Sequence, residues 1–198
     1  KDVKVIADNY KECITEELFN AYVEAINVAK SVNESVEAMP NDVENAREEL
    51  AAQLAAIKAV LTHPLTVTAA GYATLYLGFD VAIPTFEGED NGVYIVKENG
   101  INENYIHLEP VSGVLPANTG VIVKANQGTY EFVYSADEAT DVTGNLLEGS
   151  VADEYVEGAA YVLANEDGIG LYMAKLNKNA TGGEGTTHFL NNANKAYL

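Results

Sequence analysis

The side chains best suited to metal binding or nucleophilic chemistry in this chain are three histidines and one cysteine. His63, His107 and His188 lie far apart, and none has the spacing of a zinc motif, which brings together at least three ligands. Cys13 has no second cysteine with which to form a disulfide or a metal-binding pair. It falls within an apolar helical pattern, which favours a small packed residue. We therefore expect no metal and no cofactor.

Carboxylates are the most abundant chemical groups, with thirty Asp and Glu residues. They are concentrated in residues 87–92 and 137–141, and calcium prefers several oxygen ligands, but neither segment has the EF-hand spacing. The favoured interpretation is that both segments are solvated acidic loops, and calcium binding by them is the alternative. A glycosidase needs two opposed carboxylates, which a count of acidic residues does not identify. No nucleophile elbow and no phosphate-binding glycine loop is present. We predict that the chain is not an enzyme and has no catalytic residues.

Tyrosines are the remaining candidates for a binding site, since the chain has twelve of them and no tryptophan. A sugar-binding face uses exposed aromatic rings, and tyrosines in predicted strands could form one. The candidate ligand-binding residues are Tyr76, Tyr94, Tyr130, Tyr134 and Tyr172. In the alternative interpretation these rings fill the edge of the core and keep the hydroxyl at the surface.

The charge balance excludes several classes of partner. Eleven Lys and Arg against thirty Asp and Glu give a formal net charge of −19, which repels phosphate backbones and anionic membrane surfaces. We therefore expect no nucleic-acid partner. The sequence has no apolar run long enough to span a membrane, and its hydrophobic share of 47% suffices for a folded core.

The first third of the chain has the pattern of two amphipathic helices. Apolar residues recur every three or four positions in 14–32 and again in 43–61, and the first pattern continues backwards through Val3, Ile6 and Tyr10. Pro40 divides the two patterns, with Asn41 and Glu44 as the expected N-cap and its N3 partner. The pattern ends at residues 63–64, before proline. Residues 1–63 are therefore predicted to form an antiparallel helical hairpin.

The remainder, residues 64–198, has the pattern of an all-β domain. Short runs rich in β-branched and aromatic residues alternate with turn residues. The expected strands are 65–69, 72–77, 93–97, 105–108, 121–124, 129–134, 159–163, 169–174, 187–190 and 195–198. Residues 126–128 and 165–168 are predicted hairpin loops. The fold class is therefore α+β, with a helical hairpin followed by an antiparallel sandwich or barrel-like domain.

Several segments of the β half carry a family resemblance. They are residues 70–76, 115–124, 145–147, 161–163, 168–172 and 194–198. In this order they resemble a β-rich module found at the end of exported and cell-surface proteins of gut Bacteroidetes. The resemblance implies export and an accessory domain, and it implies no catalytic residues.

Three functions follow as hypotheses. The first is a non-catalytic secreted or surface-exposed protein that binds a glycan or an extracellular protein through the β domain. The second is a polysaccharide-acting enzyme or its accessory module. The third is a structural subunit of a surface assembly, whose sign would be an uncovered apolar face or a free strand edge. The chain begins at Lys1 without an apolar leader, and we expect that an export signal has been removed.

Overall fold

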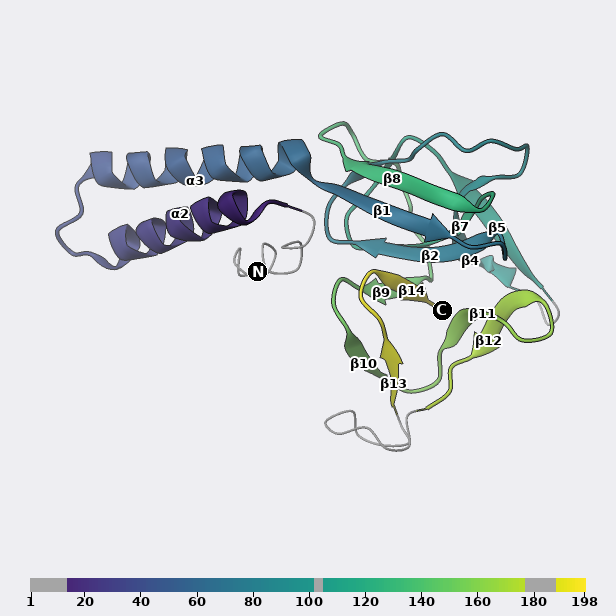
Figure 1. Cartoon of the computed structure of the whole chain (residues 1–198). Coiled ribbons are helices and arrows are strands. Elements are labelled where there is room, and N and C mark those ends of the chain that lie inside the picture. The colour runs from purple at the N-terminus through teal and green to yellow at the C-terminus, as the bar shows by residue number, and fades with distance from the viewer. Residues whose placement is uncertain (1–13, 102–104, 177–187) are drawn as a thin grey trace. The chain divides into compact units, whose positions relative to one another are not determined.

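The computed structural model describes residues 14–101, 105–176 and 188–198. It divides the chain into two compact units, residues 1–63 and 64–198. Two packed helices precede a series of antiparallel sheets, so the predicted α+β class is confirmed (Figure 1). Within the described part, neither helix combines the length and the apolar composition that a membrane crossing requires. Val3, Ile6, Tyr10 and Cys13 lie outside the described residues.

The helical unit is a hairpin of α2 (Glu16–Glu34) and α3 (Pro40–Val60). The Thr15 hydroxyl caps α2 by accepting a hydrogen bond from the Leu18 N–H at 3.4 Å. Because apolar residues recur once per helical turn, the two helices bury a shared stripe. Its buried members are Phe19, Tyr22, Ile26 and Ile57.

The start of α3 corrects the predicted cap. The helix begins at Pro40, one residue before the predicted Asn41, and the Met39 N–H donates to the Asp42 carboxylate at 2.8 Å. Proline suits the first helical position because its missing N–H would have no partner there. Glu44 is instead paired with Arg47 at 2.6 Å on the exposed surface.

The β unit contains two four-stranded antiparallel sheets. The first sheet has the order β1-β8-β3-β6 and the second has the order β2-β7-β4-β5. The first sheet comprises β1 (Thr62–Val67), β8 (Gly128–Tyr134), β3 (Val81–Ala82) and β6 (Val114–Leu115). The second comprises β2 (Tyr72–Leu77), β7 (Thr119–Lys124), β4 (Gly92–Ile101) and β5 (Ile106–Val111). Alternate side chains are fully buried between them, among them Val67, Phe132, Leu75 and Val121, as expected for a sandwich.

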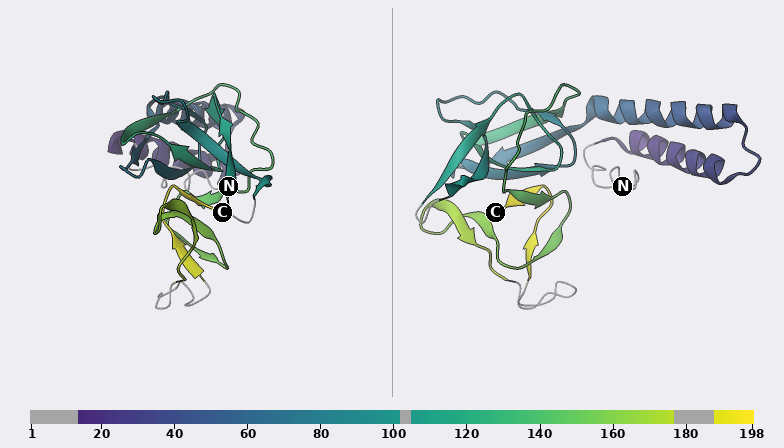
Figure 2. Two further views of the ribbon diagram at one scale, coloured as in Figure 1. Left: turned by 90° about the vertical axis from the view of Figure 1, so that its right-hand side faces the viewer. Right: turned by 180° about the vertical axis from the view of Figure 1, so that it is seen from behind.

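Three two-stranded sheets complete the β unit (Figure 2). They pair β10 (Glu154–Glu157) with β13 (His188–Asn191), β11 (Tyr161–Asn165) with β12 (Ile169–Met173), and β14 (Lys195–Tyr197) with β9 (Glu148–Ser150). All ten predicted strands are present in the described residues. The strands β3, β6, β9 and β10 were not predicted, because runs of two to four residues are too short to show alternation.

One of the two predicted hairpin loops is wrong. Residues 126–128 connect β7 of the second sheet to β8 of the first, so they cross between sheets. The loop at residues 165–168 does join an antiparallel pair, β11 and β12. Gly168 adopts a φ of 117° there, which side chains disfavour.

Candidate functional site

Three of the five predicted tyrosines share one local arrangement. Each hydroxyl donates to the carbonyl oxygen four residues earlier in the chain. The pairs are Tyr94 to Asp90 at 2.6 Å, Tyr130 to Asn126 at 3.0 Å, and Tyr172 to Gly168 at 2.8 Å. Each bond closes the turn that leads into a strand, which gives these rings a structural role.

A glycine two residues before each tyrosine makes room for the ring. A Cβ atom on Gly92, Gly128 or Gly170 would lie 3.4–3.8 Å from the ring of the following tyrosine. Side chains at positions i and i+2 point to the same face of a strand, so the ring lies over the bare glycine. The Gly-x-Tyr spacing is visible in the sequence and is the signal of this arrangement.

The other two predicted tyrosines lie elsewhere in the sandwich. Tyr76 on β2 packs against Gly149 of β9, where an added Cβ would lie 2.7 Å from the Tyr76 Cβ. Burial raises the pKa of Tyr76, helped by the charges of Glu148 and Glu154. Tyr134 is half-buried on the face of β8 that carries the buried Phe132. The five tyrosines therefore do not converge, and only Tyr172 borders the groove described next.

The β unit contains a groove of about 1040 Å³ that is lined mainly by apolar side chains. Its floor is the outward face of the second sheet, with Tyr72, Ile106, Leu108 and Ile122. Its opposite wall is the β11–β12 hairpin, with Tyr161, Leu163, Ile169 and Leu171. Figures 1 and 2 show this hairpin beside the end of the sheet formed by β4 and β5. This volume is at the upper end of the range for ligand pockets.

The hairpin wall is apolar on both faces. Cross-strand partners share a face, and the pairs Tyr161–Met173 and Leu163–Leu171 place four apolar side chains toward one side. On the other side, Val162 packs against a small buried cluster with Phe189. A strand pair on a wet surface usually has one polar face. On the face that borders the groove, Tyr161 and Ile169 are therefore apolar side chains that the described part of the chain leaves exposed.

Several of the side chains that line the groove are both hydrophobic and exposed to solvent. Among the described residues of the β unit, ten large hydrophobic side chains are exposed, and five of them line this groove. They are Ile101, Tyr105, Leu146, Tyr161 and Ile169. Tyr105 is 64% exposed and Tyr161 is 45% exposed. Concentration of such residues in one hollow is typical of a binding surface.

The described lining of the groove has no charged side chain and no amide. Its only polar side-chain atoms are tyrosine hydroxyls, from Tyr72, Tyr105, Tyr161 and Tyr172. In a chain with thirty acidic residues, this lining is set apart from the rest of the surface. The groove is suited to an apolar or aromatic ligand rather than to a charged one.

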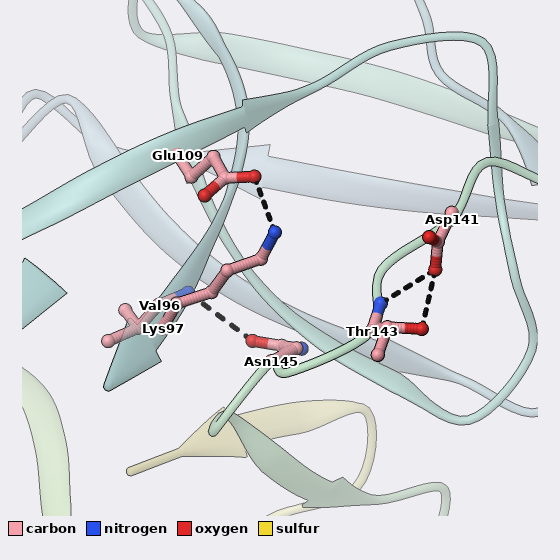
Figure 3. Close-up of polar contacts among 6 residues, drawn as sticks. All are labelled: Val96, Lys97, Glu109, Asp141, Thr143 and Asn145. Carbon is pink, nitrogen blue, oxygen red and sulfur yellow. Dashed lines mark hydrogen bonds and ion pairs between the residues drawn. The ribbon is translucent and has the colours of Figure 1, made fainter. Parts of the chain in front are cut away.

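Asn145 positions one side of the groove (Figure 3). Its Oδ1 accepts from the Val96 N–H at 3.3 Å and from the Leu147 N–H at 3.2 Å, and its Nδ2 donates to the Gly120 carbonyl at 2.8 Å. The loop is thereby attached across β4 and β7, with Leu147 buried and Leu146 exposed in the groove.

Two further polar contacts lie near this loop (Figure 3). Lys97 forms an ion pair with Glu109 at 2.6 Å, which links β4 to β5. Hydrogen bonds from the Thr143 hydroxyl and N–H lower the pKa of Asp141. The Asp141–Thr143 hydrogen bonds lie within the connection that precedes Asn145.

The other candidates from the sequence do not form a cluster. No group of three or more His, Cys, Asp or Glu residues in the described ranges has a geometry that could hold a metal ion. In the first acidic loop, Asp90 lies 3.7 Å from Lys124, and the Asn91 amide donates to the Glu87 carbonyl. These contacts are internal to the loop and its neighbouring strand.

Tyr72, Tyr105 and Tyr161 border the groove and were not among the predicted site residues. A signal existed for Tyr161, because residues 161–163 and 169–173 have apolar residues at both alternate positions. Comparison of the chain with protein-family models, with curated proteins and with solved structures finds no match. The groove is therefore the candidate functional site.

Proposed function

We propose that the chain is a non-catalytic binding protein that acts outside the cell or at its surface. Its β unit would bind an apolar segment of a partner protein in the groove. The observation that carries the proposal is the uncovered gap between two apolar sheet faces, where half of the exposed large hydrophobic side chains of the described β unit gather. The acidic surface and the sequence resemblance to exported Bacteroidetes proteins support the location.

The energetics favour an apolar ligand. Each 100 Å² of apolar surface removed from water contributes about 2.5 kcal/mol, before the entropy cost of association. Aromatic rings such as Tyr105 and Tyr161 commonly dominate such interfaces, because they bury a large area with few rotatable bonds. The groove has both features, with neutral walls that need no charge neutralised on binding.

The lining residues also support a role without catalysis. Acyl or glycosyl transfer requires a nucleophile with its base, or two opposed carboxylates. The described lining supplies neither, since it consists of aliphatic side chains, glycine and tyrosines.

A glycan ligand is the second candidate, favoured by the exposed rings of Tyr105 and Tyr161. Sugars stack on such rings, but their hydroxyls also need fixed donors and acceptors. The described lining offers tyrosine hydroxyls alone for that purpose. The apolar protein segment is therefore the better match.

The test uses the whole chain against a displayed random-peptide library and a glycan array. Replacing both Tyr105 and Tyr161 by Ala is expected to weaken binding by about 2 kcal/mol or more. Tyr155→Ala is the matched control, because Tyr155 is an exposed tyrosine on β10 that does not line the groove. Equal loss in both variants, or no loss in either, would refute the groove as the binding site.

A further inference from the structure

Strand β12 has a backbone edge that faces away from its only partner among the described residues, β11. The Tyr161 N–H and carbonyl both bond to Leu198, at 2.6 and 2.9 Å, so they point away from β12. The Ala174 N–H bonds to the Ala160 carbonyl at 2.8 Å. Because backbone groups alternate along antiparallel strands, the N–H and C=O of Leu171 and Met173 point outward from the pair.

This edge lacks the features that usually block strand pairing. Natural edge strands carry proline or charged residues that prevent addition of another chain. The edge strand β1 contains Pro64, and the edge strand β5 contains Pro110. β10 carries Glu154 and Glu157. Strand β12, with the sequence Ile-Gly-Leu-Tyr-Met, contains neither a proline nor a charge.

The side chains beside the free edge are apolar and exposed. Met173 is 63% exposed, and Ile169 is also exposed on the same face. A strand added at this edge would place every second side chain on that face, over Ile169 and Met173 and toward the groove. Recognition of a peptide by strand addition needs main-chain hydrogen bonds and pockets for alternate side chains. Here the edge of β12 would supply the hydrogen bonds and the groove would supply the pockets.

We propose that β12 is the docking edge for an extended, apolar segment of a partner protein, which adds to the β11–β12 sheet as a third strand. The inference rests on the proposed function and adds the conformation of the ligand and its main-chain contacts. Asp167 lies in the loop at one end of the edge, Glu166 of the same loop is paired with Lys175 at 2.8 Å, and the net charge of the chain is −19. The segment is therefore free of acidic residues, with any flanking charges basic.

The experiment separates main-chain from side-chain contacts at one position. Peptides are selected from a displayed random library on the whole chain, and the affinity of the best peptide is measured for Met173→Pro and Met173→Ala. Proline removes the outward N–H and leaves the bonds to β11 intact, and edge positions tolerate it. We expect Met173→Pro to weaken binding about tenfold or more and Met173→Ala to weaken it less than about threefold. Thermal unfolding of both variants verifies that they are folded.

Amide exchange gives an independent readout. Peptide binding is expected to slow hydrogen exchange at the Leu171 and Met173 amides, whose N–H groups have no strand partner among the described residues. Self-association of the chain that Met173→Pro abolishes would instead assign this edge to a second copy and overturn the assignment to a partner protein.

Equal affinity of the Pro and Ala variants, or no change in exchange at these two amides, would overturn strand addition. If the same peptide still loses affinity with the Tyr105 and Tyr161 double variant, groove binding stands and the strand proposal alone fails. Binding of glycans without any peptide would overturn strand addition and favour the second candidate ligand.

Discussion

Replacing the half-buried Asn145 by Ala should destabilise the β unit. The change removes one acceptor and one donor that serve three backbone groups, the N–H of Val96, the N–H of Leu147 and the carbonyl of Gly120. All three residues are buried. An unsatisfied buried group costs about 1–3 kcal/mol, and partial relaxation of the loop offsets some of this cost. We expect a loss of about 3 kcal/mol in the free energy of unfolding of the β unit.

The assay is urea unfolding followed in parallel by tyrosine fluorescence and far-UV circular dichroism, because a chain of two units need not unfold in one step. Asn126→Ala is the matched control, since its amide makes one long contact of 3.4 Å to the Glu87 carbonyl and is exposed. The control is expected to change stability by less than about 0.5 kcal/mol. Asn145→Ala should also weaken peptide binding, because Leu146 would no longer be held in the groove. A variant as stable as the wild type would refute the idea that this side chain attaches the loop to the sheet.

Two further predictions concern tyrosines outside the groove. Tyr22 is 2% exposed, and its hydroxyl has no hydrogen-bond partner among the described residues. Tyr22→Phe is therefore expected to raise the free energy of unfolding of the helical hairpin by about 1 kcal/mol. A lower melting temperature of this variant, measured by circular dichroism, would contradict the prediction. Burial and the charges of Glu148 and Glu154 raise the pKa of Tyr197 to about 12, from a usual value near 10. Because the unfolded chain loses this proton first, the stabilisation is present below pH 10 and is lost as the pH rises from about 10 to 12. Urea titrations across this range should show a smaller decline for Tyr197→Phe than for the wild type, and equal declines would argue against the shift.

The helical unit was predictable because its apolar residues repeat with the helical period. The apolar repeat within residues 14–32 located α2, and its members Tyr22 and Ala25 are buried, but the repeat does not include Phe19 and Ile26, which are buried as well. This rotation depends on which face meets α3, and one sequence pattern does not specify it. The predicted N-cap at Asn41 was wrong because an asparagine followed by a glutamate three residues later resembles a capping box, whereas the N-cap is Met39 and Asp42 accepts a hydrogen bond from its N–H.

The candidate site was much harder to predict than the fold. The groove combines Tyr72, Ile106 and Tyr161, which come from three distant strands, and their proximity depends on long-range pairing. The predicted tyrosines were chosen as members of strands, but Tyr94, Tyr130 and Tyr172 bond to their own turns. The Gly-x-Tyr spacing in the sequence is the local signal that these three tyrosines bond to their own turns. The free edge of β12 is visible only once the pairing of Tyr161 with Leu198 is known.

The pairing of β14 has a consequence for the order of events during synthesis. Lys195 pairs with Ser150 of β9, and the Asn194 carbonyl accepts from the Tyr76 N–H of β2. Chains are made from the N-terminus, so β2 and β9 are exposed well before residues 194–198 exist to cover them. Helices α2 and α3 pack against each other across a short loop and can pair early, whereas the pairing of β9 with β14 waits for residues 195–197. The strands of the β unit that are made first therefore lack this cover until residues 194–198 have been synthesised.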